Sequence, residues 1–439
     1  MKFRKFGRIT LALAASLVIG FGTESCHYNY TEAYIIVTGS QYNQVGSYKE
    51  NSDTGQLIAS TAPVSSGGSN PVRAVLLTGG RYVYVLNQGK QAVDASGNIT
   101  WTGANISLFS IGGQGGLSYQ LSYPSQGLGS LRVMLGSGGN FLYVLDQYQP
   151  GTTPNVTAGS PTQSAAYPCY DAKSGVYRPA GDITAYSIDD STGRLFLVQN
   201  LQQENGQGTP LSYFPLGCGP IDFHMGSSYL YTAETSDPST GNSQVVYAYQ
   251  ASAGTGQLTQ VPGGAQPITG ASNISVIGGS QSGQWIYVLD AGNNVIDIFA
   301  PGSNGLLTAA SIPSAPNNGN TTGMVALTTD SGSKYLYIAN TVSSGLNQSS
   351  SSLSIFTVTP SSGALTPDAS QQTYGTGSGP VCVFEDPSHQ YVYTADSGSS
   401  TVVGAAFDPN TGTLVPLPRG STFAVVGTPT WCLYSSNTD

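Results

Sequence analysis

Five polar side chains stand out in a chain of which only 8% of the residues are charged. They are Arg73, Arg132, Asp222, His224 and Glu385. Two arginines could hold a carboxylate or phosphate through paired N–H groups. A histidine or glutamate beside them could act as general base on a water molecule that attacks a lactone carbonyl. We therefore expect Arg73, Arg132 and Asp222 to bind a ligand, with His224 and Glu385 as catalytic candidates.

The same residues have a structural interpretation. Arg73 and Asp222 could satisfy one another, or nearby carbonyl groups, while they fill a channel. An enzyme would have Arg73, Arg132 and His224 directed into one open pocket, whereas a scaffold would have them paired or walled in. The sequence leaves both alternatives open.

A repeat of about 50 to 60 residues positions these side chains, and such a period is typical of a four-stranded propeller blade with its loops. Its most regular part is a strand with Tyr at alternating positions that ends in Asn, Asp or Glu, which start turns by bonding their own backbone. The chain contains seven copies, at residues 33–38, 82–87, 141–146, 229–234, 285–290, 335–340 and 391–396.

Turns of the type Thr-Gly-x-Leu, such as 192–195 and 255–258, follow the copies in step and open a further strand. The pattern predicts an all-β fold, a seven-bladed β-propeller of four-stranded antiparallel blades, in one domain over residues 28–439. A Pro-, Tyr- and Ser-rich insertion is expected near 147–181. The first copy lacks an innermost strand, and residues 428–434 resemble one. We expect this C-terminal strand to complete blade one and so remove an open sheet edge.

The innermost strands of a propeller line its channel, so each should place one residue in a ring. Counting back from the Tyr-rich strands predicts that ring, and a slip of one residue would turn a side chain away. Its predicted members are Arg73, Arg132, Asp222, Ser275, Met324, Cys382 and Trp431.

The recurrent strands Tyr-Val-Tyr-Val-Leu-Asn (82–87) and Tyr-Val-Tyr-Thr-Ala-Asp (391–396) resemble those of the lactonase-type seven-bladed propellers, the 6-phosphogluconolactonase-like and Tyr-Val-Thr-Asn-repeat family. The resemblance covers nearly all of residues 28–439 and implies lactonase chemistry by His, Arg and acidic side chains around the channel. That family often opens its innermost strand with Pro-His. Here Pro71, Pro220, Pro380 and Pro429 are followed by Val, Ile, Val and Thr. The histidine that often follows this proline in the family is thus absent at all four positions.

The N-terminus has the organisation of a secretory signal. Four basic residues within the first eight precede an uncharged apolar run at 9–20, and Thr-Glu-Ser then precedes Cys26. We expect residues 1–25 to be removed and the protein to act in the periplasm or at the cell surface. Cys26 is a candidate for lipidation, and an ordinary cut after Ser25 is the alternative. The membrane would then be contacted only through that lipid.

Four cysteines remain beyond Cys26: Cys169, Cys218, Cys382 and Cys432. An even number suits disulfide bonds in an oxidising compartment. Three pairings are possible, and order along the chain favours Cys169 with Cys218 and Cys382 with Cys432.

Charge and composition exclude several functions. Without residues 1–25, which carry four of the 14 basic and one of the 23 acidic residues, the chain has a net charge of −12, which repels nucleic acid. Only three histidines occur and no calcium-loop motif is present, so we expect no metal and no cofactor.

The expected function is that of a monomeric, exported cell-envelope propeller that binds an envelope protein or glycan through its channel mouth and loops. Abundant Tyr, Ser, Gly and Asn suit such amphipathic contacts. The alternative is a lactone hydrolase whose channel arginines hold a small anionic sugar or lactone.

Overall fold

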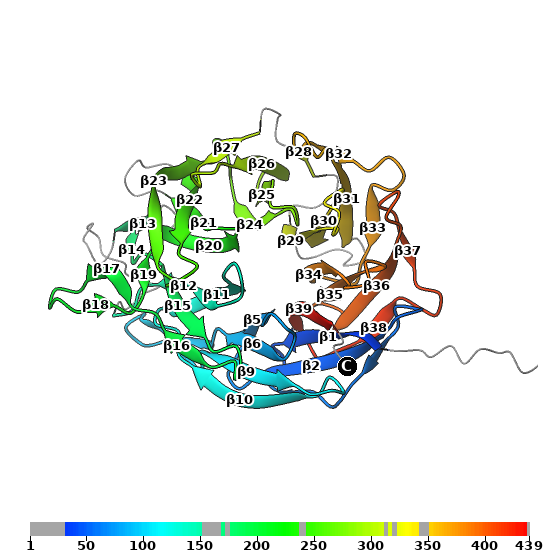
Figure 1. Ribbon diagram of the computed structural model, residues 1–439, viewed down its shortest axis with the longest axis horizontal. Helices are drawn as coiled ribbons and strands as arrows, with labels where there is room; N and C mark the ends of the chain where they lie inside the picture. Colours follow the sequence, from blue (N-terminus) through cyan, green and yellow to red (C-terminus); the bar gives the residue numbers. More distant parts are fainter. Residues whose placement is uncertain are drawn as a thin grey trace, which may run out of the picture.

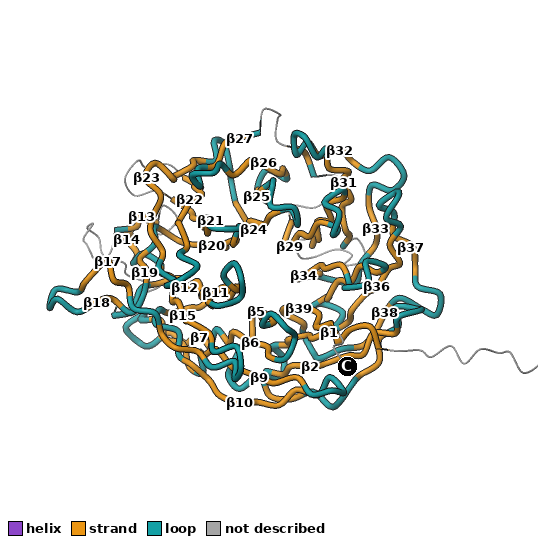
Figure 2. Tube along the Cα trace, in the orientation of Figure 1, coloured by secondary structure: helices purple, strands orange, loops and turns teal. Residues whose placement is uncertain are grey.

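Seven antiparallel sheets are arranged in a ring around a common axis in the computed structural model (Figure 1). The structure describes residues 31–151, 168–171, 176–236, 243–310, 315–317, 323–341 and 351–436. The expected signal segment and Cys26 lie outside these residues. The described chain consists of strands and turns, with no helix long and apolar enough to cross a membrane (Figure 2). The prediction of a seven-bladed β-propeller with four-stranded blades is confirmed.

Each blade is given from its innermost to its outermost strand. Blade 1 contains β39 (Pro429–Ser436), β1 (Thr31–Gly39), β2 (Gln44–Asn51) and β3 (Leu57–Ala59). Blade 2 contains β5 (Pro71–Leu76), β6 (Tyr82–Asn87), β9 (Asn105–Ile111) and β10 (Leu117–Tyr123). Blade 3 contains β11 (Leu128–Leu135), β12 (Phe141–Tyr148), β15 (Asp182–Ile188) and β16 (Leu195–Leu197). Blade 4 contains β20 (Cys218–Met225), β21 (Tyr229–Ser236), β22 (Ser243–Ala251) and β23 (Leu258–Pro267).

The last three blades follow the same order. Blade 5 contains β24 (Ile274–Gly279), β25 (Ile286–Asp290), β26 (Val295–Pro301) and β27 (Leu307–Ala309). Blade 6 contains β29 (Gly323–Thr329), β30 (Tyr335–Thr341), β31 (Ser352–Val358) and β32 (Leu365–Pro367). Blade 7 contains β34 (Pro380–Glu385), β35 (Tyr391–Asp396), β36 (Thr401–Phe407) and β37 (Leu414–Pro416).

Short strands complete the sheets or form separate hairpins. The additional strands that pair within blades are β4 (Val64–Ser65), β19 (Phe214–Pro215), β28 (Ala315–Pro316), β33 (Thr373–Gly375) and β38 (Thr422–Ala424). The separate hairpins are β7 (Lys90–Val93) with β8 (Ile99–Thr102), β13 (Cys169–Asp171) with β14 (Val176–Arg178), and β17 (Asn200–Glu204) with β18 (Pro210–Leu211). The β13–β14 hairpin belongs to the stretch expected to be an insertion.

Neighbouring blades are joined by an aromatic–glycine contact that explains the two sequence repeats. In blade 2, the Tyr82 hydroxyl donates to the Ser191 carbonyl of the Thr-Gly-x-Leu turn in blade 3, and the Tyr84 hydroxyl donates to the Gly193 carbonyl. Gly193 has φ 68°, and a Cβ there would meet the Tyr82 ring at 2.9 Å. Only glycine combines this backbone conformation with room for the ring.

The contact recurs around the whole ring, including the step from blade 7 to blade 1. The ring–glycine pairs are Tyr34–Gly115, Tyr82–Gly193, Phe141–Gly256, Tyr229–Gly305, Trp285–Gly363, Tyr335–Gly412 and Tyr391–Gly55. The alternating aromatic residues and the glycine turns are therefore two halves of one interface between blades.

The ring closes between the two ends of the described chain. Strand β39 pairs with β1 in antiparallel register, which the sequence predicted, and Figure 1 shows the red and blue strands side by side. A disulfide between Cys382 of β34 and Cys432 of β39 joins blade 7 to blade 1. A second disulfide joins Cys169 of β13 to Cys218 of β20. These are the pairings that order along the chain favours.

The acids that end the second strands have different partners in different blades. Asp290 accepts hydrogen bonds from the backbone N–H groups of Gly292 and Asn293, so it starts its own turn. Asp396 instead accepts from the Thr394 hydroxyl. The expectation that these acids start turns thus describes Asp290 but not Asp396.

Candidate functional site

A β-bulge near the start of every innermost strand determines which side chains reach the channel. In β5 the pairing register shifts between Pro71 and Arg73, and in β20 it shifts between Pro220 and Asp222. A bulge adds one residue and re-aims the side chains that follow it. Proline suits this place, because it has no N–H to leave unpaired.

Aligning the strands on their bulges gives a ring that differs from the predicted one at two positions. Val276 takes the place expected for Ser275, because the β24 register shifts between Ile274 and Val276. Ala326 takes the place expected for Met324, which is fully buried between blades. The aligned ring is Arg73, Arg132, Asp222, Val276, Ala326, Cys382 and Trp431.

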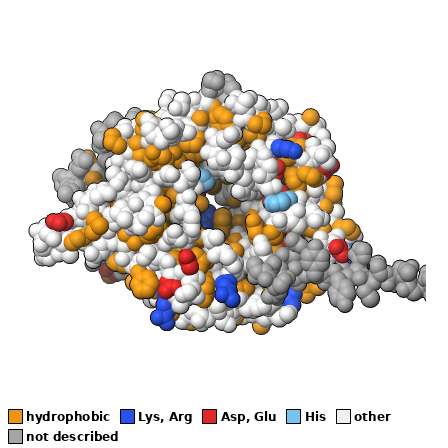
Figure 3. All heavy atoms as spheres, in the orientation of Figure 1, with side chains coloured by type: hydrophobic (Ala, Val, Ile, Leu, Met, Phe, Trp, Pro, Cys, Tyr) orange, Lys and Arg blue, Asp and Glu red, His pale blue; other side chains and the backbone are white. Residues whose placement is uncertain are grey.

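Six members of this ring line a cavity of about 390 Å³ in the middle of the propeller, whereas Cys382 is fully buried in its disulfide with Cys432. Arg73, Arg132, Asp222, His224 and Trp431 all line it, together with apolar residues of blades 5 to 7. Figure 3 shows it as a hollow at the centre of the molecule, with blue and pale-blue side chains inside. Its size and mixture of apolar walls with few polar groups are usual for small-molecule sites.

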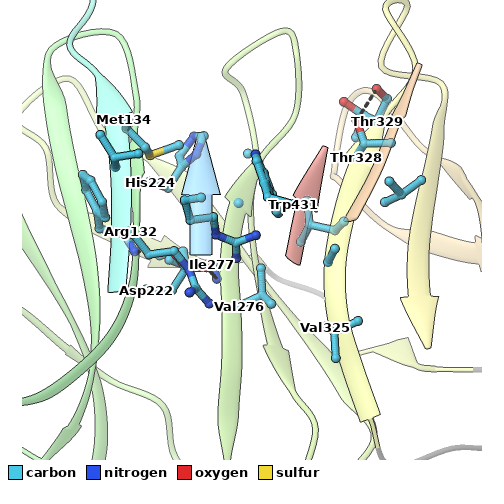
Figure 4. A pocket seen from close by; sticks show the side chains of 18 of the residues that line it. Arg132, Met134, Asp222, His224, Val276, Ile277, Val325, Thr328, Thr329 and Trp431 are labelled. Carbon is cyan, nitrogen blue, oxygen red and sulfur yellow. Dashed lines mark hydrogen bonds and ion pairs between the residues drawn. The ribbon is translucent and has the colours of Figure 1, made fainter. Parts of the chain in front are cut away.

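Arg132 and Asp222 form an ion pair across two blades (Figure 4). The Nε of Arg132 lies 2.9 Å from Oδ1 of Asp222, and its Nη1 donates to the Leu131 carbonyl. Asp222 also accepts from the backbone N–H groups of Phe223 and Ile277, the second of which belongs to blade 5. Asp222 therefore holds Arg132 in place and links three blades.

Arg73 is held differently, by the indole of Trp431. Its guanidinium carbon lies 3.5 Å above the ring centroid, and only 8% of the residue is exposed. No described residue accepts a hydrogen bond from the guanidinium. Burial and the nearby charge of Arg132 lower the pKa of Arg73 well below its usual range. Because arginine still stays protonated, this charge is one that a bound anion would stabilise.

His224 lies on the same strand as Asp222 and borders the cavity beside Met134 (Figure 4). Its burial lowers the pKa to about 4, although the charge of Asp222 acts in the opposite direction. The imidazole is therefore neutral at pH 7 and can accept a proton. Gly279 of blade 5 makes room for it, since a Cβ there would lie 2.3 Å from Nε2.

Glu385 does not line the cavity. Its Oε2 accepts from the backbone N–H of Ser331 in the β29–β30 turn of blade 6, and it lies 3.3 Å from Nδ1 of His389. Burial raises its pKa. The structure thus brings together Arg73, Arg132, Asp222 and His224, and places Glu385 at a contact between blades.

Two contributors to the site were not expected from the sequence. The sequence predicts Trp431 in the ring but not its stacking on Arg73, and it indicates no role for Gly279. An aromatic residue at the ring position of one blade, next to an arginine at the ring position of the adjacent blade, is a signal that would have predicted the stacking. No local pattern marks Gly279, because its role depends on a neighbouring blade.

Known proteins share both the sequence signature and the architecture. The family model for the lactonase seven-bladed β-propeller matches residues 282–434. No curated protein sequence gives a significant match. A proposed 6-phosphogluconolactonase from Bacteroides uniformis superposes with a TM-score of 0.65 at 14% identity, over 92% of this chain and 100% of that one.

Two further solved structures are similar. A proposed 6-phosphogluconolactonase from Bacteroides fragilis has a TM-score of 0.64 at 16% identity, covering 93% of this chain and 99% of its own. The periplasmic gluconolactonase of Pseudomonas aeruginosa has a TM-score of 0.64 at 15% identity, covering 92% and 99%. The chain therefore has the fold of a seven-bladed β-propeller, and residues 282–434 match the lactonase family model. At these identities the structural likeness concerns the fold alone.

Proposed function

We propose that the protein binds a small anionic sugar lactone in its channel and hydrolyses it. The observation that carries this proposal is the convergence of Arg73, Arg132 and neutral His224 on one cavity. Arg73 is buried, charged and stacked on Trp431 rather than on an acid, so its N–H groups are available to a ligand. The 6-phosphogluconolactonase and gluconolactonase neighbours suggest the substrate class.

The chain's own residues account for a simple hydrolysis. Arg73 and the free edge of Arg132 hold the anionic group of the substrate and orient its ring. The unprotonated imidazole of His224 takes a proton from water as the water oxygen attacks the lactone carbonyl. The bond between the carbonyl carbon and the ring oxygen then breaks, and the ring oxygen receives that proton. The product is the open-chain hydroxy acid.

We further propose that the protein is exported, with residues 1–25 as its signal and Cys26 either lipidated or next to the cut. Two disulfides among the described residues suit an oxidising compartment. The similar Pseudomonas aeruginosa protein is itself periplasmic.

A second candidate function is binding of an envelope ligand without turnover. The Arg132–Asp222 ion pair favours it, because this pairing neutralises one of the two channel cations. The position of Glu385 outside the cavity favours it as well, since Asp222 is then the only acid among the lining residues.

Measuring both hydrolysis and binding on the mature protein and its variants distinguishes the two candidate functions. The purified mature chain should open gluconolactone or 6-phosphogluconolactone faster than buffer, and should bind the product acid in calorimetry. Arg73→Gln should weaken binding of the acid about 10- to 100-fold, because a charge-assisted contact contributes roughly 1.5–3 kcal/mol. His224→Gln should abolish turnover while it preserves binding.

Arg194→Gln is the matched control, because it removes an exposed charge in a distant turn. Binding without turnover would select the second candidate. If neither the lactones nor the acids bind, the hydrolase proposal is wrong, and the binding candidate is wrong as well if immobilised mature protein retains no envelope protein or glycan.

A further inference from the structure

Two acids are buried outside the channel, at the place where the chain leaves blade 3 and returns to it. Asp146 lies near the end of β12, and Asp182 is the first residue of β15. The two residues are opposite one another in the β12–β15 register, and neither is exposed to solvent. Adjacent buried carboxylates require a proton or a positive charge between or beside them.

Asp146 is surrounded by hydroxyl groups. Its Oδ1 accepts from Ser130 at 2.5 Å, and its Oδ2 accepts from Ser125 at 2.5 Å and from Thr184 at 3.1 Å. Burial raises its pKa to about 6, and these hydrogen bonds act in the opposite direction. The hydroxyl groups therefore favour a negative charge at this position.

Asp182 has no such partners. Neither of its carboxylate oxygens receives a hydrogen bond, although the side chain is fully buried. A Cβ on Gly127 would lie 2.2 Å from Oδ1 of Asp182, 2.5 Å from Cβ of Asp146 and 2.8 Å from the Tyr148 carbonyl oxygen. Oδ1 of Asp182 and the Tyr148 carbonyl oxygen therefore border the same space beside Asp146.

Blade 2 shows how the same position is filled without a charge. Asn87 and Asn105 occupy the equivalent pair of the β6–β9 register, and Nδ2 of Asn87 donates to Oδ1 of Asn105 at 2.8 Å. One amide can donate to the other in this way, whereas two ionised carboxylates have no hydrogen to share. The substitution of both amides by acids occurs in blade 3, between whose second and third strands the β13–β14 hairpin is inserted.

We propose that Asp146 and Asp182 bind a calcium ion, which fixes the base of the inserted segment to blade 3. Carboxylate, hydroxyl and carbonyl oxygens are the ligands that Ca²⁺ prefers, in flexible sets of six to eight. Mg²⁺ suits the place less well, because it demands near-octahedral geometry and gives up its water reluctantly. This site is independent of the channel.

Thermal unfolding of the mature protein with Ca²⁺ or Mg²⁺ tests the proposal. Protein stripped with EDTA and desalted should gain about 3 °C in Tm when CaCl₂ is added at about 100 times Kd, as expected for a ligand that binds only the folded chain of this size. MgCl₂ should give a smaller shift. Equilibrium dialysis should find one Ca²⁺ per chain.

Variants locate the effect. Asp182→Asn should lose both the Tm shift and the retained calcium. The double variant Asp146→Asn/Asp182→Asn should recreate the amide pair of blade 2, fold without calcium and be insensitive to it. Asp396→Asn, which alters a buried acid of blade 7, is the control and should keep the full response.

Two outcomes would overturn the proposal. One is a wild-type Tm that calcium does not change, together with no calcium in dialysis, which would mean that the two acids share only a proton. The other is a calcium response that survives in the double variant, which would place the ion elsewhere.

Discussion

At the scale of single residues, the two channel arginines occupy equivalent positions in the repeat but have different partners. Arg132 is bound by an acid and Arg73 by an indole. A cation on an aromatic face keeps its N–H groups free at the ring edge, while an ion pair uses them. Arg73 therefore has more N–H groups available to bind an anion, whereas the side chain of Arg132 is held more firmly in one orientation.

His224 should make the folded protein sensitive to mild acid. Because burial lowers its pKa to about 4, the folded histidine stays neutral while the unfolded one, with a pKa near 6.5, takes up a proton. Above about pH 7 the group has no effect. As the pH falls from 6.5 towards 4, the free energy of unfolding should fall by about 2 kcal/mol in total, after allowance for the solvent in the channel.

Urea unfolding at a series of pH values measures this effect. His224→Gln should remove that part of the pH dependence, whereas His389→Gln, whose side chain is exposed, should retain it. An unchanged slope in His224→Gln would contradict the lowered pKa.

At the scale of elements, the glycine turns between the third and fourth strands are interface residues. In blade 4, Gly256 has φ 69°, and a Cβ there would lie 2.5 Å from the Phe141 ring of blade 3. Gly254, two residues earlier, has nothing within 4 Å of the same position. Gly254 is therefore a control for substitution in the same turn, because it has neither the left-handed backbone nor the close contact of Gly256.

Gly256→Ala should destabilise the protein by about 2–4 kcal/mol, because it combines a strained left-handed backbone with a clash against a packed ring. Gly254→Ala should change the free energy of unfolding by less than about 0.5 kcal/mol. Urea unfolding of the two variants compares them directly. Equal losses would contradict a special role for the left-handed backbone of Gly256 and for its contact with the Phe141 ring.

The elements also show how far the sequence predicts this molecule. Alternating Tyr residues and glycine turns predicted seven blades and the closing strand, because both patterns are dictated by local backbone geometry. The predicted ring is wrong at Ser275 and Met324, because Ile274 and Met324 occupy the bulge position at which four other blades have a proline. The prediction that Glu385 belongs to the channel site is wrong for another reason, because its partner, Ser331, lies on a different blade.

At the scale of the whole molecule, the two disulfides close loops of nearly equal length, with separations of 49 and 50 residues. They differ in the parts of the propeller that they join. Removing either should cost about 4 kcal/mol by loop entropy alone. Only Cys382–Cys432 connects the closing strand to the blade beyond it.

The double variants Cys382→Ser/Cys432→Ser and Cys169→Ser/Cys218→Ser should therefore unfold at similar urea concentrations. Amide hydrogen exchange should separate them, with faster exchange in β39 and β1 for the first variant only. Identical exchange patterns would mean that hydrogen bonding and packing hold the closing strand without the disulfide.

The placement of Trp431 on β39 has a consequence for biosynthesis. This strand leaves the ribosome after every other described strand, and it carries the indole on which Arg73, made more than 350 residues earlier, must stack. A nascent or prematurely terminated chain can form most of its blades but has no platform for the channel cation. Because the proposed function depends on this stacking, we expect fragments that lack β39 to lose ligand binding in the channel.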